Sequence, residues 1–177
     1  VDLLLDSGKV LRFNDPRRFG TVLFQAGEEP HSLLQSLGPE PLSEAFNGER
    51  MFARSRGRKV AVKSFIMDNA TVVGGGNIYA QESLFMAGIH PSRAAGRISL
   101  ARYQALAEAI KVVLARAIET GGATLVDFSR ADGEAGYFAQ SLNVYGRAGQ
   151  PCLQCEAILK ADRHGQRSTA YCPQCQR

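Results

Sequence analysis

The sequence predicts an α+β protein with more than one domain, and three observations support this prediction. Residues 1–26 contain short apolar runs separated by turn signals, which is typical of β-strands. Residues 31–120 carry apolar side chains at helical spacing. All four cysteines lie between residues 147 and 177. We therefore expect three domains, at residues 1–30, 31–146 and 147–177.

The composition is that of an ordinary globular protein. The chain has 177 residues, of which 45% are hydrophobic and 21% charged. No apolar run reaches the length of a membrane span. The net charge of +4 and the pI of about 9.0 favour a polyanionic partner, although a basic protein need not have one. Val1 looks like a residue inside a strand, so we expect that the N-terminal part of a longer protein precedes it.

Three strands are expected in residues 1–26. Ser7-Gly8 is a two-residue hairpin signal between VDLLLD and KVLRFND, and GTVLFQ reads as the third strand. The turn NDPRRFG places Arg17, Arg18 and Phe19 side by side. Phe19 is then either a core anchor or an aromatic wedge that enters a stack of bases.

Three longer helices are expected in residues 31–120. The first begins after Ser43 as N-cap and runs toward Arg54. The second runs from Asn77 to Gly88, and the third opens at Ser99 and stops at Gly121-Gly122. Its apolar stripe is predicted to be core and consists of Leu100, Tyr103, Leu106, Ile110, Val113, Leu114 and Ala117.

Three glycines precede the second of these helices, in VVGGGNIYAQE at residues 72–82. The stretch is not a dinucleotide fingerprint, because the third glycine would fall at Tyr79, and it lacks the lysine of a phosphate loop. It is either a plain turn or a helix N-terminus at which Asn77 and backbone N–H groups hold a phosphate. The window before it is basic, and is either a solvated face or part of the same site. Its cations are Arg50, Arg54, Arg56, Arg58, Lys59 and Lys63.

The cysteines follow the pattern C-x2-C, sixteen residues, C-x2-C. Four thiolates at this spacing predict one structural Zn²⁺ held in a closed site by Cys152, Cys155, Cys172 and Cys175. Two disulfides are the alternative. The spacer suits a β-hairpin that presents Lys160, Arg163, His164 and Arg167, and its partner is nucleic acid or another protein.

Four motifs together resemble the bacterial formamidopyrimidine-DNA glycosylases. They are DPRRFG, MDNATVVGGGNIYAQESLFMAGIHP, DGEAGYFAQSLNVYGR and CLQC…QRSTAYCPQC, in the family's order, and the resemblance runs over essentially the whole chain. The resemblance implies the end of an N-terminal β-sandwich, a helical domain with a helix–two-turns–helix motif, and a zinc-ribbon hairpin. It also implies base excision repair of oxidised purines, 8-oxoguanine and formamidopyrimidine, by a bifunctional DNA glycosylase and AP lyase that cleaves the strand by β,δ-elimination.

The resemblance also implies roles for individual residues. Lys63 and Asn77 match the residues that hold phosphates around the lesion, and Arg58 falls where the family usually has a DNA-contacting lysine. Arg167 matches the ribbon arginine that grips the backbone and takes part in the elimination. Arg17 and Phe19 match the residues that fill and wedge the gap left by the extruded base.

A loop at residues 129–137 is expected to cover the extruded base, with Ser129, Gly136 and Tyr137 as its candidate residues. The family's nucleophile is an N-terminal proline followed by glutamate. The chain begins at Val1, so we expect this chain alone to be inactive.

The expected partner is double-stranded DNA with an oxidised base or an abasic site. The expected setting is a bacterial cytoplasm, at the nucleoid, as a monomer and without a membrane. Two alternatives stay open. One is a non-catalytic damaged-DNA-binding module, and the other is a zinc ribbon that binds a protein partner.

Overall fold

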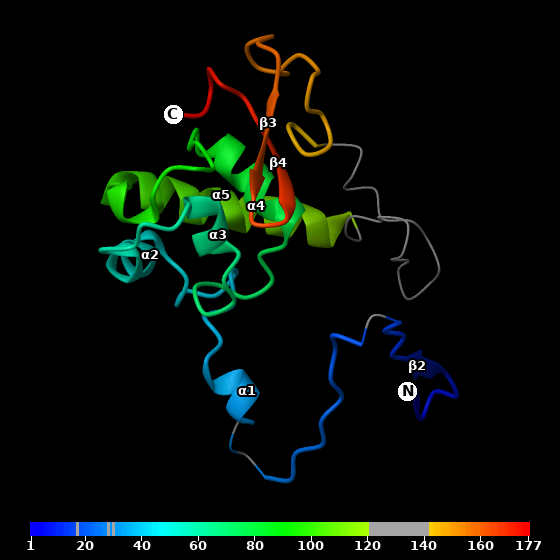
Figure 1. Ribbon diagram of the computed structural model, residues 1–177. Helices are drawn as coiled ribbons and strands as arrows, with labels where there is room; N and C mark the ends of the chain where they lie inside the picture. Colours follow the sequence, from blue (N-terminus) through cyan, green and yellow to red (C-terminus); the bar gives the residue numbers. More distant parts are fainter. Residues whose placement is uncertain (17, 28, 30, 121–141) are drawn as a thin grey trace. The chain divides into compact units, whose positions relative to one another are not determined.

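The computed structural model describes residues 1–16, 18–27, 29, 31–120 and 142–177 (Figure 1). It divides into two compact units, Val1–Gln35 and Ser36–Arg177. The expected helix stop at Gly121-Gly122 and the expected loop at 129–137 lie outside the described residues. Within the described part of the chain, no helix is both long and apolar enough to cross a membrane.

The first unit contains the predicted hairpin. Strand β1 (Asp2–Leu4) pairs antiparallel with β2 (Val10–Arg12), and Leu3 faces Leu11 in the register. The turn closes where the N–H of Gly8 donates to the Leu5 carbonyl, and Gly8 has a φ of +73°. Glycine suits this left-handed conformation because it has no Cβ. A short helix, α1 (Ser32–Gln35), ends the unit.

The prediction of a third strand at GTVLFQ was wrong for the described residues. None of residues 20–25 lies in a strand, and β1 and β2 form a sheet of two strands. A strand needs a neighbour for its backbone N–H and C=O groups, and alternating apolar residues alone do not supply one. Phe24 in this stretch is 93% exposed.

The second unit contains several helices, two of which, α2 (Gly48–Ser55) and α4 (Asn77–Met86), pack against the longest one, α5 (Leu100–Glu119). The unit also contains α3 (Val62–Ile66) and the 3₁₀ helix η1 (Ala95–Arg97). Tyr103 of α5 lies at the centre of the core, where the rings of Phe52 and Phe65 meet it edge-on and its hydroxyl donates to the Ala95 carbonyl at 2.9 Å. Burial of these large side chains is the main force that holds the helices together.

Two sequence predictions about these helices need correction. Helix α2 begins at Gly48, and its N-cap is Asn47, whose side chain accepts from the Arg50 N–H at 2.9 Å. Ser43 lies in a preceding turn, where its hydroxyl donates to the Glu40 carbonyl. In the apolar stripe of α5, Leu100 is the first residue of the helix and is 38% exposed, whereas the other six residues are buried. Ser99 is the N-cap of α5, as predicted.

The C-terminal hairpin packs on the helical part of this unit. Strand β3 (Lys160–His164) pairs antiparallel with β4 (Arg167–Tyr171), with Gly165 in the turn at a φ of +61°. Phe85 of α4 shares an apolar cluster with residues of the cysteine-bearing segment, namely Val144, Cys152, Leu159, Ala170 and Cys172. The prediction of a helical domain followed by a zinc-finger hairpin is confirmed.

Candidate nucleic-acid interface and metal centre

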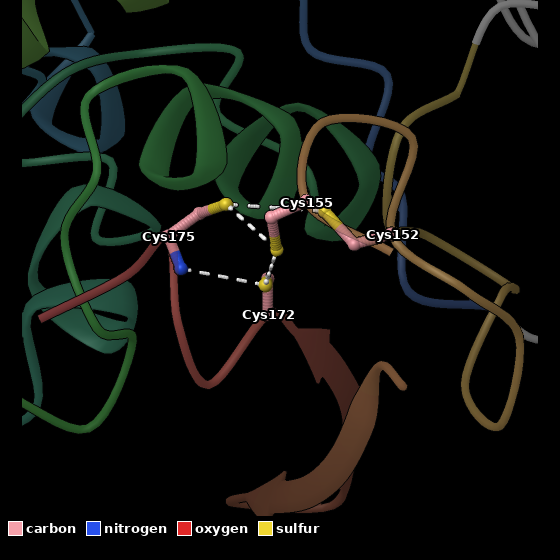
Figure 2. Close-up of side chains that lie close together, drawn as sticks. All are labelled: Cys152, Cys155, Cys172 and Cys175. Atoms are coloured by element: carbon pink, nitrogen blue, oxygen red, sulfur yellow. Dashed lines mark hydrogen bonds between the residues drawn. The ribbon is translucent and has the colours of Figure 1, made fainter. Parts of the chain in front are cut away.

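The four cysteines converge on one point, and Figure 2 shows their side chains directed toward one another. Their Sγ atoms all lie within 4.8 Å of one another. Cys155 Sγ lies 3.4 Å from both Cys172 Sγ and Cys175 Sγ, and Cys152 Sγ lies 3.9 Å from Cys175 Sγ. Four thiolates around a tetrahedral Zn²⁺, each about 2.3 Å from it, lie roughly 3.8 Å apart. The cysteines are not in disulfides, and the cluster fits one structural zinc, as predicted.

Backbone N–H groups favour the thiolate form of Cys172, which is the form that binds a metal cation. Burial alone would raise the pKa of the Cys172 thiol, but the N–H groups of Cys175 and Gln174 and the neighbouring thiols lower it to about 7. Burial and the neighbouring thiols raise the pKa of Cys175. Thiols this close cannot all ionise without a cation among them, because like charges repel. A bound Zn²⁺ would supply that charge and hold the hairpin in place, without an open position for catalysis.

A second cluster forms where α3, α4 and β4 meet. The Lys63 side chain is buried, and its Nζ donates to Thr169 Oγ1 at 2.6 Å and to the Ser168 carbonyl at 3.3 Å. The same carbonyl accepts from Asn77 Nδ2 at 3.4 Å and from Gln81 Nε2 at 3.2 Å. One carbonyl of the hairpin thereby gathers three donors from two helices.

Gln81 contacts the hairpin through both atoms of its side-chain amide. Its Oε1 accepts from the Ala170 N–H at 2.7 Å, so the side chain binds β4 as a neighbouring strand would. Asn77 Oδ1 is buried and has no hydrogen-bond partner among the residues that the structure describes. A buried acceptor of this kind is costly, and its amide lies at the N-terminus of α4.

The electrostatics of this cluster favour an anion. Burial, and then the charge of Arg167, lower the pKa of Lys63 to about 8. Arg167 and Lys63 both line an open pocket of about 270 Å³, together with His164 and the hairpin turn. Among the described residues, no ion pair joins Lys63 or Arg167 to a carboxylate. A buried ammonium is normally paired, so these two cations lack an anion that a ligand phosphate can supply.

Two of the three glycines before α4 are explained by the fold itself, and the third has free space beside it. Gly74 has a φ of +76°, which glycine adopts most easily. A Cβ at Gly75 would lie 2.7 Å from the Ile66 carbonyl oxygen, so the end of α3 requires a glycine there. At Gly76, the residue before α4, a Cβ would meet only the Tyr79 ring at 3.7 Å. The plain-turn interpretation therefore explains Gly74 and Gly75, and close approach of a ligand stays a prediction for Gly76.

The remaining predicted DNA contacts lie elsewhere. Arg58 is exposed in the turn between α2 and α3 and lines a separate pocket of about 390 Å³ with Lys59 and Arg97. Phe19 is 81% exposed in the first unit, as are other large apolar residues there, and its role as core anchor or wedge stays a prediction. Asp15 closes the turn around it, accepting from the Gly20 N–H. Arg17 lies outside the described residues.

The expected loop residues Ser129, Gly136 and Tyr137 also lie outside the described residues, but the chain that follows them is firmly held. Glu82 of α4 is 3% exposed, and its carboxylate accepts from the N–H groups of Asn143, Val144 and Tyr145 and from Asn143 Nδ2, at 2.8–2.9 Å. This carboxylate caps the turn that leads into the zinc hairpin.

Several residues of this interface were not predicted from their sequence positions. Gln81, Ser168 and Thr169 lie inside the quoted motifs, but no role was predicted for them. The one available signal is the helical spacing of Asn77 and Gln81, which places both on one face of α4.

Two family models match the chain. The formamidopyrimidine-DNA glycosylase H2TH domain matches residues 37–129, and the zinc finger found in FPG and IleRS matches residues 149–177. A formamidopyrimidine-DNA glycosylase of Alcanivorax borkumensis is 89% identical over 177 residues, and one of Alteromonas mediterranea is 59% identical. All of this chain aligns, but it spans 66% of each relative.

Solved structures agree with these relatives. The MutM (Fpg) protein of Thermus thermophilus has a TM-score of 0.88 and 38% identity, covering 99% of this chain and 67% of that one. A complex between the Lactococcus lactis Fpg and DNA containing an abasic site has a TM-score of 0.75 and 31% identity, covering 82% of this chain and 53% of that one.

Proposed function

Because this chain belongs to the formamidopyrimidine-DNA glycosylase family, we propose that it forms the damaged-DNA-binding part of a base excision repair glycosylase. The observation that supports this most directly is the cluster at Ser168. There Lys63, Asn77 and Arg167 gather at one helix N-terminus and one hairpin, with no carboxylate paired to the two cations among the described residues. A phosphodiester supplies the missing charge.

The binding part of the mechanism follows from these residues. One phosphate oxygen is held by Lys63 and Asn77 at the start of α4, and the Arg167 guanidinium grips the backbone from the hairpin. The exposed Phe19 enters the space that the damaged base leaves, and Arg17 and Arg58 contribute further contacts. The zinc site holds β3 and β4 so that Arg167 stays beside Lys63.

The chemistry that we propose for the whole protein is that of the family. It removes oxidised purines, 8-oxoguanine and formamidopyrimidine, and cleaves the strand by β,δ-elimination, with Arg167 assisting at the backbone. The covalent step is assigned by the resemblance to an N-terminal Pro-Glu pair. We assign to residues 1–177 the recognition and distortion of DNA, and propose that they cleave no DNA by themselves. The residues at 129–137 are proposed to contact the extruded base.

Binding to a short duplex tests this function. The zinc-loaded chain is expected to bind a duplex with a stable abasic-site analogue more tightly than the undamaged duplex at fixed salt. Phe19→Ala should reduce this preference, whereas Phe24→Ala, at a similarly exposed position, should not. Borohydride should trap no covalent adduct. Equal binding to both duplexes, or no binding with zinc present, would contradict the proposal.

A further inference from the structure

Lys63 is the end of a chain of hydrogen bonds that reaches the surface of the hairpin. Thr169 Oγ1 lies 2.6 Å from Lys63 Nζ and 3.0 Å from His164 Nδ1. His164 Nε2 lies 2.7 Å from Ser92 Oγ, which in turn donates to Asp162 Oδ2 at 3.1 Å. These links connect α3 to both strands of the hairpin and to the loop after α4.

With a neutral histidine, one assignment of the protons satisfies every contact. An ammonium has only donors, so the Thr169 hydroxyl accepts from Lys63, and its own proton can go to an unprotonated His164 Nδ1. The ring then carries its proton on Nε2 and donates it to Ser92 Oγ. Ser92 gives its hydroxyl proton to the Asp162 carboxylate, which has acceptors only. In this assignment each group between the two ends has one donor and one acceptor role in use, and His164 is neutral with its proton on Nε2.

The surroundings of His164 agree with a neutral ring. Burial lowers the pKa of His164, as do the charges of Lys63 and His90, and Asp162 opposes them. Arg167, a second cation, is its partner across the hairpin. His90 cannot donate from Nδ1 in this loop, because that atom accepts from the Ser92 N–H at 3.2 Å.

We propose that His164 is a positioning residue for phosphate binding, because it holds the Thr169 hydroxyl in the orientation that fixes the Lys63 ammonium. The proposal rests on the proposed function, in which Lys63 meets a DNA phosphate. Lys63 uses two of its three N–H donors on Thr169 and Ser168, and the third serves the ligand. Without the acceptor at His164 Nδ1, the hydroxyl turns freely and Lys63 leaves its place beside Arg167.

The first test is the state of His164 in the zinc-loaded chain without DNA. Long-range proton–nitrogen NMR spectra are expected to show a neutral ring protonated on Nε2 at about pH 7.5, above the usual pKa of histidine. The same sample should show a slowly exchanging Lys63 ammonium signal that is lost in Thr169→Val and kept in Thr169→Ser. A ring protonated on Nδ1, or a Lys63 signal unaffected by Thr169→Val, would overturn the proposal.

The second test is a double-mutant cycle on binding to the abasic-analogue duplex. His164→Leu should weaken binding about tenfold, and His164→Asn should recover most of the loss, because the Asn carbonyl can accept near the Nδ1 position. In a Lys63→Met background, His164→Leu should change binding less than about twofold. An equal loss in both backgrounds would mean that His164 acts without Lys63, and would overturn the proposal.

Zinc content and thermal midpoint of each variant separate this role from a loss of folding. If His164→Leu does not fold, the pair Thr169→Val and Thr169→Ser replaces it in the cycle. If the unaltered chain binds no duplex, the proposed function fails, and the NMR spectra alone decide whether His164 positions Lys63.

Discussion

At the scale of single residues, the molecule concentrates its unusual chemistry at Lys63. Its side chain is buried, but its hydrogen-bond partners are a neutral hydroxyl and a carbonyl, and the charge that most affects its pKa is that of another cation, Arg167. Such an arrangement costs stability in the absence of a ligand. A bound phosphate would pair the Lys63 charge and offset this cost, and we therefore propose that the DNA backbone binds here.

The lowered pKa of Lys63 makes DNA binding depend on pH. Phosphate binds the protonated ammonium, and the pKa in the unbound chain is about 8. Affinity should therefore be constant well below pH 8 and fall above it, to about a tenth of its pH 7 value by pH 9. Lys63→Arg, which stays charged throughout, should remove this dependence. Fluorescence anisotropy titrations across this range measure both, and parallel profiles would count against the Lys63 contact.

The glycine turn offers a matched pair of substitutions. Gly76→Ala should leave the free energy of unfolding within about 1 kcal/mol of the wild type but weaken DNA binding, because only a ligand needs the space beside Gly76. Gly75→Ala should destabilise the fold by about 1–3 kcal/mol, because its Cβ meets the Ile66 carbonyl. Denaturant unfolding and duplex binding distinguish them. Unaltered DNA binding by Gly76→Ala would favour a plain turn.

At the scale of elements, α4 organises the second unit. Its first residue, Asn77, and its next turn, Gln81, bind β4, and the following residue, Glu82, caps the segment that leads into the zinc hairpin. Phe85 then joins the apolar cluster at the cysteines. One helix therefore sets the positions of the phosphate cluster and the metal centre together.

Glu82→Gln tests this role of α4. The amide would turn an N–H₂ group toward backbone donors and lose a charged acceptor, so we expect a destabilisation of about 2–4 kcal/mol. Glu108→Gln on α5 is the control, because its exposed carboxylate pairs with Lys111 at the surface, and should change stability by less than about 0.5 kcal/mol. Denaturant unfolding of the zinc-loaded chain measures both. Equal effects would show that Glu82 is not an anchor.

Elements with a strong local signal were predictable from the sequence. Helix α5 has its N-cap at Ser99 and six of seven predicted core residues, and α4 begins at Asn77 as expected. The N-cap of α2 was misplaced because Ser43 and Asn47 are both good capping residues, and the local sequence does not distinguish them. The prediction of a third strand was wrong because strand pairing depends on a neighbouring strand, which no local sequence pattern specifies.

At the scale of the whole molecule, the metal centre and the helical core are separable. The buried core around Tyr103 contains no residue of the cysteine-bearing segment among the residues that the structure describes. Removal of zinc with a chelator should therefore abolish DNA binding through loss of Arg167 and Ser168, and leave most of the helical circular dichroism. Added Zn²⁺ should restore binding, and Mg²⁺ should not. Retained DNA binding after complete removal of zinc would contradict the role of the hairpin.

The candidate site was predictable only in part. Asn77, Arg167 and the four cysteines came from motifs, and Lys63 came from the basic window and the resemblance. The structure brings Lys63, Asn77 and Arg167 together at the hairpin. Ser168, Thr169 and Ser92 were not predictable, because their importance lies in contacts between segments far apart in the sequence. Their side chains are ordinary, and only the folded arrangement gives them a role.

The salt dependence of binding tests the central claim most directly. If Lys63 and Arg167 each neutralise a phosphate, Lys63→Met and Arg167→Ala should each reduce the slope of log affinity against log salt by about 0.9 on the abasic-analogue duplex. Lys111→Met, on α5 and paired with Glu108, should leave the slope unchanged. Slopes for Lys63→Met and Arg167→Ala equal to that of the wild type would contradict the account, because neither cation would then bind DNA.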